Sequence, residues 1–276
     1  MHRRVKQALI LAIFALAAAY VLRAPLRSAA WGLRGAWEVA ALHALPVPAP
    51  SEVPAHIAHA GGSLRGMTYT NALEALEQNF ARGTRWFEID FLDASDGGYW
   101  AVHDWHEIHE RLGIPLDGAG RGLVPHAQSP SAPYRIPSLD ETLAWFAAHA
   151  EAHMVTDTKG DNLALLRRLA TEPPEIRARI HPQIYLIEEY AQARAAGFGA
   201  PIFTTYRSQY PWWILDRFVR AYPVLAVTVT LAEAQDACAA LCATVPLLTH
   251  TVNDRSQEEA LRRGGIAGVY TDELLP

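Results

Sequence analysis

Residues 85–92 read Arg-Trp-Phe-Glu-Ile-Asp-Phe-Leu, an apolar and aromatic run that carries two acids. The run predicts a buried strand, in which residues two apart point to the same face, so Glu88 and Asp90 can aim at one point in space. Two carboxylates on a buried strand are costly unless a cation meets them. Because carboxylate oxygens suit magnesium or calcium, the stretch indicates a divalent metal site. The alternative is that one acid forms a salt bridge and the other caps a loop.

A histidine lies on each side of this strand in the sequence. His59 ends a short apolar segment and precedes Ala-Gly-Gly, and His103 follows Tyr-Trp-Ala-Val and precedes Asp104. A single histidine at either position would be more typical of a core or a loop. Two histidines that bracket a pair of acids favour general acid–base chemistry, because imidazole exchanges protons near neutral pH.

A further strand adds an acid and a cation. Residues 154–160 read Met-Val-Thr-Asp-Thr-Lys-Gly, so Asp157 and Lys159 share one strand face. Together with the residues above they make three acids, two histidines and a lysine. This set predicts a metal-assisted site for an anionic substrate, most naturally a phosphate ester.

The order of these motifs resembles that of the glycerophosphodiester phosphodiesterase family and its relatives, the phosphatidylinositol phospholipase C-like and sphingomyelinase D-like enzymes. The resemblance spans roughly residues 56–276, and no single motif carries it. The matching motifs, in chain order, are His59-Ala60-Gly61, Thr70-Asn71-Ala72, Glu88-Ile89-Asp90, Asp96-Gly97, His103-Asp104, Ile136-Pro137-Ser138-Leu139, Asp157-Thr158-Lys159, Thr251-Val252-Asn253 and Thr271-Asp272.

The resemblance implies a metal-dependent phosphodiesterase that cleaves glycerophosphodiesters, lysophospholipids or other phospholipid head groups. Mg²⁺ or Ca²⁺ would bind Glu88, Asp90 and Asp157. His59 and His103 would share the roles of base and acid, and the sequence leaves open which does which. Two other functions stay open: a phospholipase D-like lyase that forms a cyclic phosphate, and a non-catalytic envelope barrel that binds lipid or carbohydrate.

Three positions depart from the family pattern. Ala60 stands where an arginine is expected, Thr70 where a glutamate is expected, and His250 where a tryptophan is usual. A phosphate in a water-poor site still needs a positive partner besides the metal. We expect Lys159 to supply it, with Arg65 in the loop after Gly61-Gly62 as the second candidate.

The remainder of the chain alternates short apolar strands with amphipathic helices. About eight such strands over some 220 residues predict a (β/α)8 TIM barrel, a fold of on the order of 250 residues whose active site lies at the carboxyl ends of its strands. The segment that ends in His103 is taken as one of these strands. Residues 105–135 follow it as a long connection, which we interpret as a structureless lid over the site.

The amino terminus predicts a separate membrane segment. A basic start precedes the apolar run Ala8 to Leu22, which fits either an uncleaved signal-anchor or a cleaved signal peptide within residues 1–30. Residues 31–55 hold an amphipathic segment, which either lies in the membrane interface or packs under the barrel, and then a proline-rich linker. The phosphodiesterase domain would occupy residues 56–276, outside the cytoplasm.

Composition limits the partners. The net charge of −5, with no basic run beyond the first residues, argues against nucleic-acid binding. Cys238 and Cys242 lie four apart on an expected helix, and we interpret them as two core thiols in preference to a disulfide or a metal pair.

Overall fold

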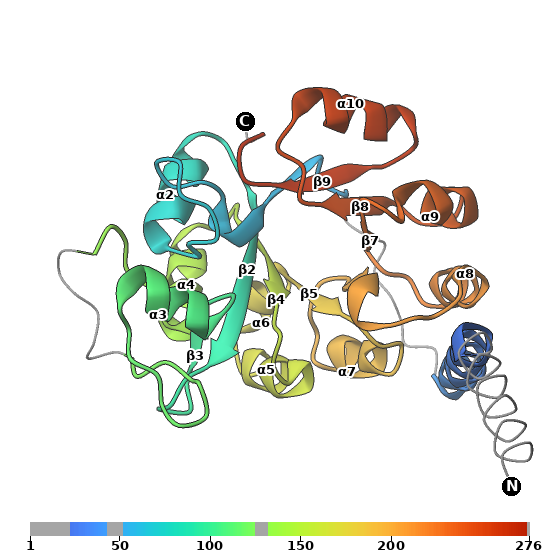
Figure 1. Cartoon of the computed structure of the whole chain (residues 1–276), viewed down its shortest axis with the longest axis horizontal. Coiled ribbons are helices and arrows are strands. Elements are labelled where there is room, and N and C mark those ends of the chain that lie inside the picture. The colour runs from blue at the N-terminus through green and yellow to red at the C-terminus, as the bar shows by residue number, and fades with distance from the viewer. Residues whose placement is uncertain (1–22, 43–51, 125–131, 275–276) are drawn as a thin grey trace, which may run out of the picture.

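The computed structural model describes residues 23–42, 52–124 and 132–274, and it contains a closed parallel barrel (Figure 1). Neighbouring strands follow the order β1-β9-β8-β7-β6-β5-β4-β2, and a β1–β2 pairing closes the ring. The barrel strands are β1 (His56–Ala58), β2 (Trp86–Asp93), β4 (His153–Asp157), β5 (Ile180–Ile184), β6 (Ile202–Thr204), β7 (Ala226–Thr230), β8 (Leu247–His250) and β9 (Gly268–Thr271). The predicted TIM barrel is confirmed.

Helices surround the barrel, as the amphipathic stretches of the sequence predicted (Figure 1). They are α2 (Leu73–Ala81), α4 (Leu139–Ala148), α5 (Asn162–Leu169), α6 (Pro174–Arg177), α7 (Glu189–Ala195), α8 (Trp212–Ala221), α9 (Ala234–Leu241) and α10 (Arg255–Arg263). Several start at side-chain caps, such as the capping box in which Ser138 and Glu141 bond each other's backbone at the start of α4.

The alternation of side chains along β2 orients the two acids. Phe87, Ile89 and Phe91 belong to the core between the barrel and its helices and are fully buried. Burying each of them contributes roughly 1.5–3 kcal/mol. Because successive side chains of a strand point to opposite faces, this outward apolar face turns Glu88 and Asp90 towards the inside of the barrel.

The predicted strand that leads to His103 is not part of the barrel. It forms β3 (Tyr99–Ala101), which pairs antiparallel with β2 in a hairpin. The reason is the length of β2: its parallel pairing with β4 ends at Asp90, and Phe91–Asp93 then pair with β3. His103 therefore reaches the site from a hairpin that extends one barrel strand.

The connection over residues 105–135 is not a structureless lid in its described parts. It begins with α3 (Trp105–Leu112), and its Trp105, Ile108 and Ile114 pack in a hydrophobic cluster that also contains Leu64 and Trp100. The sequence did not predict this packing, because the apolar residues of the connection are spread between glycine- and proline-containing turns and show no regular period. Residues 125–131 lie outside the described part.

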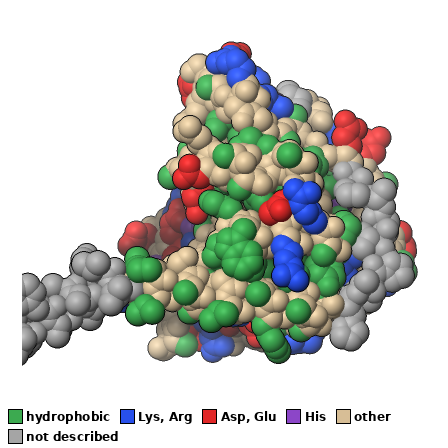
Figure 2. All heavy atoms as spheres, turned by 90° about the vertical axis from the view of Figure 1, so that its right-hand side faces the viewer, with side chains coloured by type: hydrophobic (Ala, Val, Ile, Leu, Met, Phe, Trp, Pro, Cys, Tyr) green, Lys and Arg blue, Asp and Glu red, His purple; other side chains and the backbone are tan. Residues whose placement is uncertain are grey.

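The amino-terminal segment packs on the barrel. Residues 23–41 are helical and lie beside α8, on the side of the molecule that Figure 2 faces. The approach is close at Gly35, where an added Cβ would lie 2.6 Å from Ile214. The ring of Trp31 contacts Tyr210 edge-on at 4.9 Å. Residues 31–42 therefore pack against the barrel through one face of the helix, whereas Leu33 and Trp37 are exposed.

The predicted signal or anchor, Ala8 to Leu22, lies outside the described residues. Among the residues that are described, none of the helices has both the length and the apolar character needed to cross a membrane.

Cys238 and Cys242 form a disulfide, so the prediction of two core thiols is wrong. Side chains four apart on a helix are neighbours. Their Cα atoms lie 4.7 Å apart at the end of α9, within the range that a disulfide can bridge.

Candidate active site

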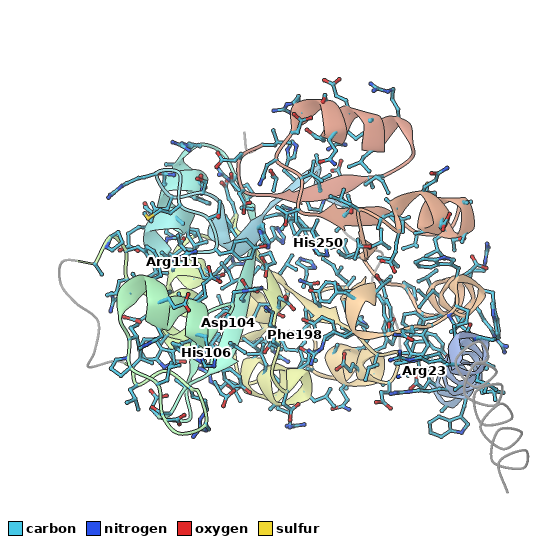
Figure 3. The ribbon with its side chains drawn as sticks, in the orientation of Figure 1. Arg23, Asp104, His106, Arg111, Phe198 and His250 are labelled. Atoms are coloured by element: carbon cyan, nitrogen blue, oxygen red, sulfur yellow. A yellow bond between two sulfur atoms is a disulfide. The ribbon has the colours of Figure 1, made fainter. Side chains whose placement is uncertain are left out.

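A cavity of about 180 Å³ opens at the carboxyl ends of the barrel strands, and we call it the mouth. Figure 3 shows one of its residues, His250, inside the ring of strands, with Asp104 and His106 at the start of α3. The mouth is lined by His59, Tyr69, Glu88, Asp90, His103, Asp157, Lys159, Gln183, Tyr206, Thr228, His250 and Tyr270.

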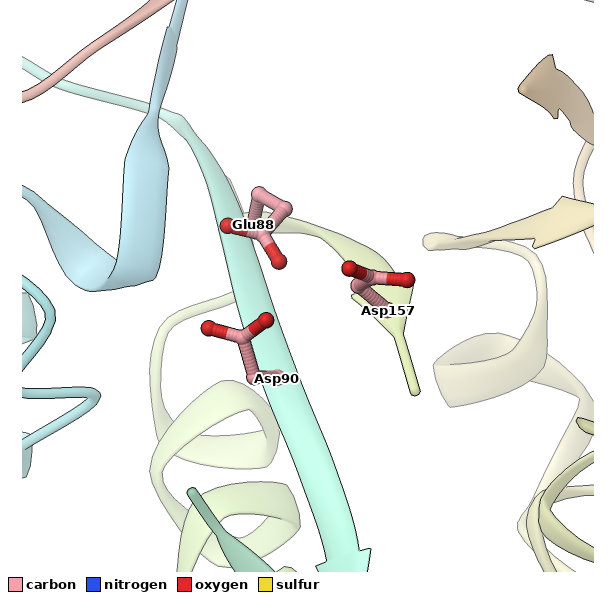
Figure 4. Close-up of side chains that lie close together, drawn as sticks. All are labelled: Glu88, Asp90 and Asp157. Carbon is pink, nitrogen blue, oxygen red and sulfur yellow. The ribbon is translucent and has the colours of Figure 1, made fainter. Parts of the chain in front are cut away.

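The three predicted acids converge in this cavity. Glu88 and Asp90 project from β2 and Asp157 from β4, and an oxygen of each lies within 4.8 Å of the others (Figure 4). Asp90 pairs with Asp157 across the two strands, which places their side chains side by side. The i, i+2 spacing thus places Glu88 and Asp90 on one face of β2, and the pairing of β2 with β4 brings Asp157 beside them.

Burial and mutual repulsion make the ionised form of these acids unfavourable. Burial raises the pKa of Glu88 well above its usual range, and the charges of Asp90 and Asp157 raise it further. Burial also raises the pKa of Asp90, with a second contribution from Asp157. Oε2 of Glu88 accepts a hydrogen bond from the backbone N–H of Ala60 at 2.8 Å. Oε1 is buried and has no partner within the described residues. A cation among the three carboxylates fits this arrangement.

Asn71 holds Asp90 in place. Its amide Nδ2 donates to Oδ2 of Asp90 at 3.0 Å, and its Oδ1 accepts from the backbone N–H of Asp90 at 3.0 Å. Asn71 has a positive φ of 49°, a conformation that asparagine tolerates better than most residues. This role keeps Asn71 out of the helix, which begins at Leu73. The sequence offered only the motif Thr70-Asn71-Ala72 as a signal.

Two tyrosines bind Asp157, and sequence reasoning missed both. The hydroxyl of Tyr206 donates to Oδ2 of Asp157 at 3.1 Å, and the hydroxyl of Tyr185 donates to Oδ1. Burial first and the charge of Asp157 second raise the pKa of each tyrosine well above its usual range. Both hydroxyls therefore stay protonated and can donate to the carboxylate. Neither tyrosine lies in a motif, so nothing in the sequence signalled this contact.

His59 is paired with an acid from the last strand. Its Nδ1 lies 3.0 Å from Oδ1 of Asp272. Asn253 fixes that carboxylate: its Nδ2 donates to Oδ2 of Asp272 at 2.7 Å, and its Oδ1 accepts from the backbone N–H of Asp272. Asn253 and Asp272 of the motifs Thr251-Val252-Asn253 and Thr271-Asp272 thus hold His59 in place.

His103 is paired with the predicted lysine. Nζ of Lys159 lies 3.3 Å from Nδ1 of His103, and the carboxylate of Glu107 lies at 3.8 Å from the same nitrogen. Asp104, the residue after His103, caps the start of α3, and the helix begins at Trp105. The ring of Tyr69 lies between the two histidines, with centroids 4.5 Å from His59 and 5.0 Å from His103.

The structure separates the two candidate cations. Lys159 lines the mouth, whereas Arg65 is exposed and lines a surface hollow with Glu74, Glu77 and Trp145. Arg65 lies outside the mouth because its loop turns back at the Leu64–Met67 bridge. The structure gives no support to Arg65 as a replacement for the arginine that Ala60 displaces.

His250, one of the three residues that depart from the expected family pattern, lines the mouth. Its ring contacts Tyr206 at 5.3 Å and Tyr270 at 6.2 Å. Nε2 of His250 is buried, and no residue in the described ranges bonds it. Burial first and the neighbouring His59 second lower the pKa of His250, so its neutral form is favoured.

Solved structures with a similar architecture include several glycerophosphodiester phosphodiesterases. A glycerophosphodiester phosphodiesterase from Thermotoga maritima matches with a TM-score of 0.60 and 15% identity, over 84% of this chain and 96% of that chain. A phosphodiesterase from Oleispira antarctica, in complex with the product sn-glycerol-3-phosphate, matches with a TM-score of 0.58 and 19% identity over 79% and 93%. A glycerophosphodiester phosphodiesterase from Parabacteroides distasonis matches with a TM-score of 0.56 and 15% identity over 79% and 92%.

The chain has the fold of the glycerophosphodiester phosphodiesterases. The resemblance read from the ordered motifs is therefore confirmed for the fold. No protein-family model and no curated protein matches the sequence. At two positions where the sequence departs from the expected family pattern, the structure shows the backbone N–H of Ala60 bonded to Glu88 and His250 inside the mouth.

Proposed function

We propose that this chain is a metal-dependent phosphodiesterase that hydrolyses glycerophosphodiesters. The observation that carries the proposal is the convergence of Glu88, Asp90 and Asp157 within 4.8 Å, in a cavity that also holds His59 and His103. The shared fold supports it, as does the product named for the Oleispira antarctica enzyme.

Mg²⁺ or Ca²⁺ would be held by Glu88, Asp90 and Asp157, whose oxygen ligands suit hard cations. Oε1 of Glu88 is buried and has no hydrogen-bond partner among the described residues, which supports this assignment. When bound, the ion polarises a phosphoryl oxygen and offsets the charge that develops on it. Asn71, Tyr185 and Tyr206 hold Asp90 and Asp157 in place through the hydrogen bonds described above.

The hydrogen bonds of the two histidines support different roles for them. Asp272 can only accept, so Nδ1 of His59 carries a proton and Nε2 is left to accept one. The ammonium of Lys159 can only donate, so Nδ1 of His103 accepts and the ring proton lies on Nε2. The contact of His103 with Glu107, at 3.8 Å, is too long for a hydrogen bond.

His59 is therefore the base and His103 the acid. His59 takes a proton from water as the water oxygen bonds to phosphorus, and Asp272 stabilises the resulting imidazolium. As the bond from phosphorus to the leaving oxygen breaks, His103 gives its Nε2 proton to that oxygen. At the same time its Nδ1 takes a proton from the ammonium of Lys159, so the ring stays neutral. The products are a phosphomonoester and an alcohol.

Lys159 and His250 contact the substrate in this proposal. Lys159 supplies a positive charge to the phosphate from the rim of the mouth. Nε2 of His250 bonds a hydroxyl of the substrate, because a buried nitrogen without a partner costs roughly 1–3 kcal/mol. A polar, hydroxylated substrate such as a glycerophosphodiester suits this cavity.

We also propose that the domain acts outside the cytoplasm. The apolar run Ala8 to Leu22 after a basic start supports export. The Cys238–Cys242 disulfide supports an oxidising compartment.

The test is a product assay with metal-depleted and metal-reloaded full-length protein. The substrates are glycerophosphodiesters, lysophospholipids and sphingolipids, and phosphorus NMR identifies the products. We expect metal-dependent formation of a phosphomonoester from a glycerophosphodiester. His106→Asn is the matched control, because His106 is exposed on α3 and does not line the mouth. A cyclic phosphate product would identify a lyase, and no turnover of any substrate would favour a binding barrel.

A further inference from the structure

The helix over residues 23–41 carries an apolar face that points away from the barrel. Leu26 is 66% exposed, Leu33 76% and Trp37 69%. These residues are spaced i, i+7 and i+11, so at 100° per residue they form one stripe along the helix. The opposite face of the helix, with Gly35 and Val39, is buried against the barrel.

The stripe is extended by a tryptophan from α8. Trp213 is 59% exposed and lies against the helix, 3.5 Å from where a Cβ of Gly32 would be. Figure 2 shows hydrophobic side chains gathered on this side of the molecule, next to Lys and Arg side chains. Of the large hydrophobic residues that are exposed in the described part of the chain, more than half lie here.

Two further features indicate what covers this face. Only three residues separate Leu22, the end of the apolar run that begins at Ala8, from Leu26. Arg23 and Arg27 are exposed on the same first turns of the helix. Tryptophan is typical of the boundary between lipid and water, and arginine there pairs with anionic head groups.

We propose that Leu26, Leu33, Trp37 and Trp213 lie in the interface of a lipid bilayer that contains anionic lipids. The helix then runs along the membrane surface with its inner face on α8, and it fixes the orientation of the barrel relative to the bilayer. This inference is independent of the proposed activity, because it rests on the outer surface alone.

The test uses the full chain reconstituted in vesicles of phosphatidylcholine and phosphatidylglycerol. A polarity-sensitive maleimide dye is attached to Leu33→Cys or, separately, to Trp37→Cys, without reductant. The Cys238–Cys242 disulfide then leaves only the introduced thiol reactive among the residues of this chain. Glu259→Cys on α10, also exposed, is the matched control in the same anchored protein.

We expect the dye at both stripe positions to shift its emission to the blue and to be quenched by nitroxide-labelled lipid, and the dye at position 259 to do neither. Water-like emission at both stripe positions would overturn the proposal. A blue shift that lipid nitroxides do not quench, and that depends on protein concentration, would also overturn it in favour of contact with a second copy of the chain.

Discussion

Nζ of Lys159 lies 3.3 Å from Nδ1 of His103, although 56 positions separate the two residues in the sequence. The contact joins the cation that we assign to the phosphate with the histidine that we assign to the leaving group. Because an ammonium only donates, it also fixes the proton of His103 on Nε2, which is the nitrogen that must give a proton away.

Replacement of Lys159 should therefore lower catalytic efficiency in two ways, because it removes a positive charge near the phosphate and the hydrogen-bond donor to His103. Lys159→Met is expected to lower kcat/KM by about 10²-fold or more, the scale of losing one preorganised donor. Arg65→Met is the matched control and should leave both kcat and KM close to those of the wild type, because Arg65 lies outside the mouth. Steady-state kinetics on the same glycerophosphodiester compares them. A large loss in Arg65→Met with normal turnover in Lys159→Met would reverse the assignment.

Substitutions should distinguish the two histidines, which we propose transfer protons, from Asp272, which positions one of them. His59→Asn and His103→Asn are each expected to lower kcat by about 10²–10⁴-fold with the fold retained, since both transfer protons. Asp272→Asn should lower kcat through His59 and leave KM near that of the wild type, because Asp272 positions the imidazole. Circular dichroism checks the fold, and near-normal turnover in a folded variant would remove that residue from the mechanism.

Glu88 should make the metal-free protein less stable. Its pKa is raised in the folded state, so its proton is held more tightly there than in the unfolded chain. The stabilisation that this proton gives is present at low pH, and it is lost as pH rises above the unfolded pKa and through the folded one. Glu88→Gln imitates the protonated form and should raise the melting temperature of metal-free protein at neutral pH.

The same substitution should remove the response to metal. At a metal concentration of a hundred times Kd, the wild-type free energy of unfolding should rise by about 2.7 kcal/mol. Glu88→Gln should show little rise and no turnover. Thermal melts with and without chelator measure the change in stability of both proteins. Full activity in thoroughly chelated wild-type protein would contradict the metal hypothesis.

His250 should act on substrate affinity. If a substrate hydroxyl bonds its buried Nε2, His250→Phe should weaken binding by roughly 1–3 kcal/mol, which is about 5- to 150-fold in KM. The effect on kcat should be smaller than that of His103→Asn, because His250 is not placed to transfer a proton. An unchanged KM in His250→Phe would show that this nitrogen does not contact the substrate.

The location of the barrel can be tested with a fusion. A reporter joined after Pro276 should be active only outside the cytoplasm, because the basic start of the chain keeps the amino terminus inside. A soluble mature chain that begins near Trp31 would show that the segment is a cleaved signal peptide. A reporter active only in the cytoplasm would contradict export altogether.

The sequence was sufficient where local pattern decides structure. The alternation in residues 85–92 placed Glu88 and Asp90 on one face of a strand, and the eightfold recurrence of strand and helix predicted the barrel. In a parallel barrel all strands end at the same side, so motifs far apart in the chain had to meet there. This geometry explains why the sequence could predict that His59, Asp157 and Lys159 share one site, whereas His103 reaches that site from the β2–β3 hairpin.

Tertiary structure decided what depends on contacts between distant residues. Only the folded chain shows that β3 leaves the barrel, that Arg65 points elsewhere, and that Cys238 bonds Cys242. The hydrogen-bond partners of two candidate site residues were also visible only in the folded chain: Asp272 pairs with His59 across 213 positions, and Tyr206 bonds Asp157 across 49. Hydrogen bonds are short and directional, so they form only where backbone paths already run within a few ångströms of each other. A sequence pattern predicts which face of a strand or helix a residue lies on, but it does not predict which distant residue that face will contact.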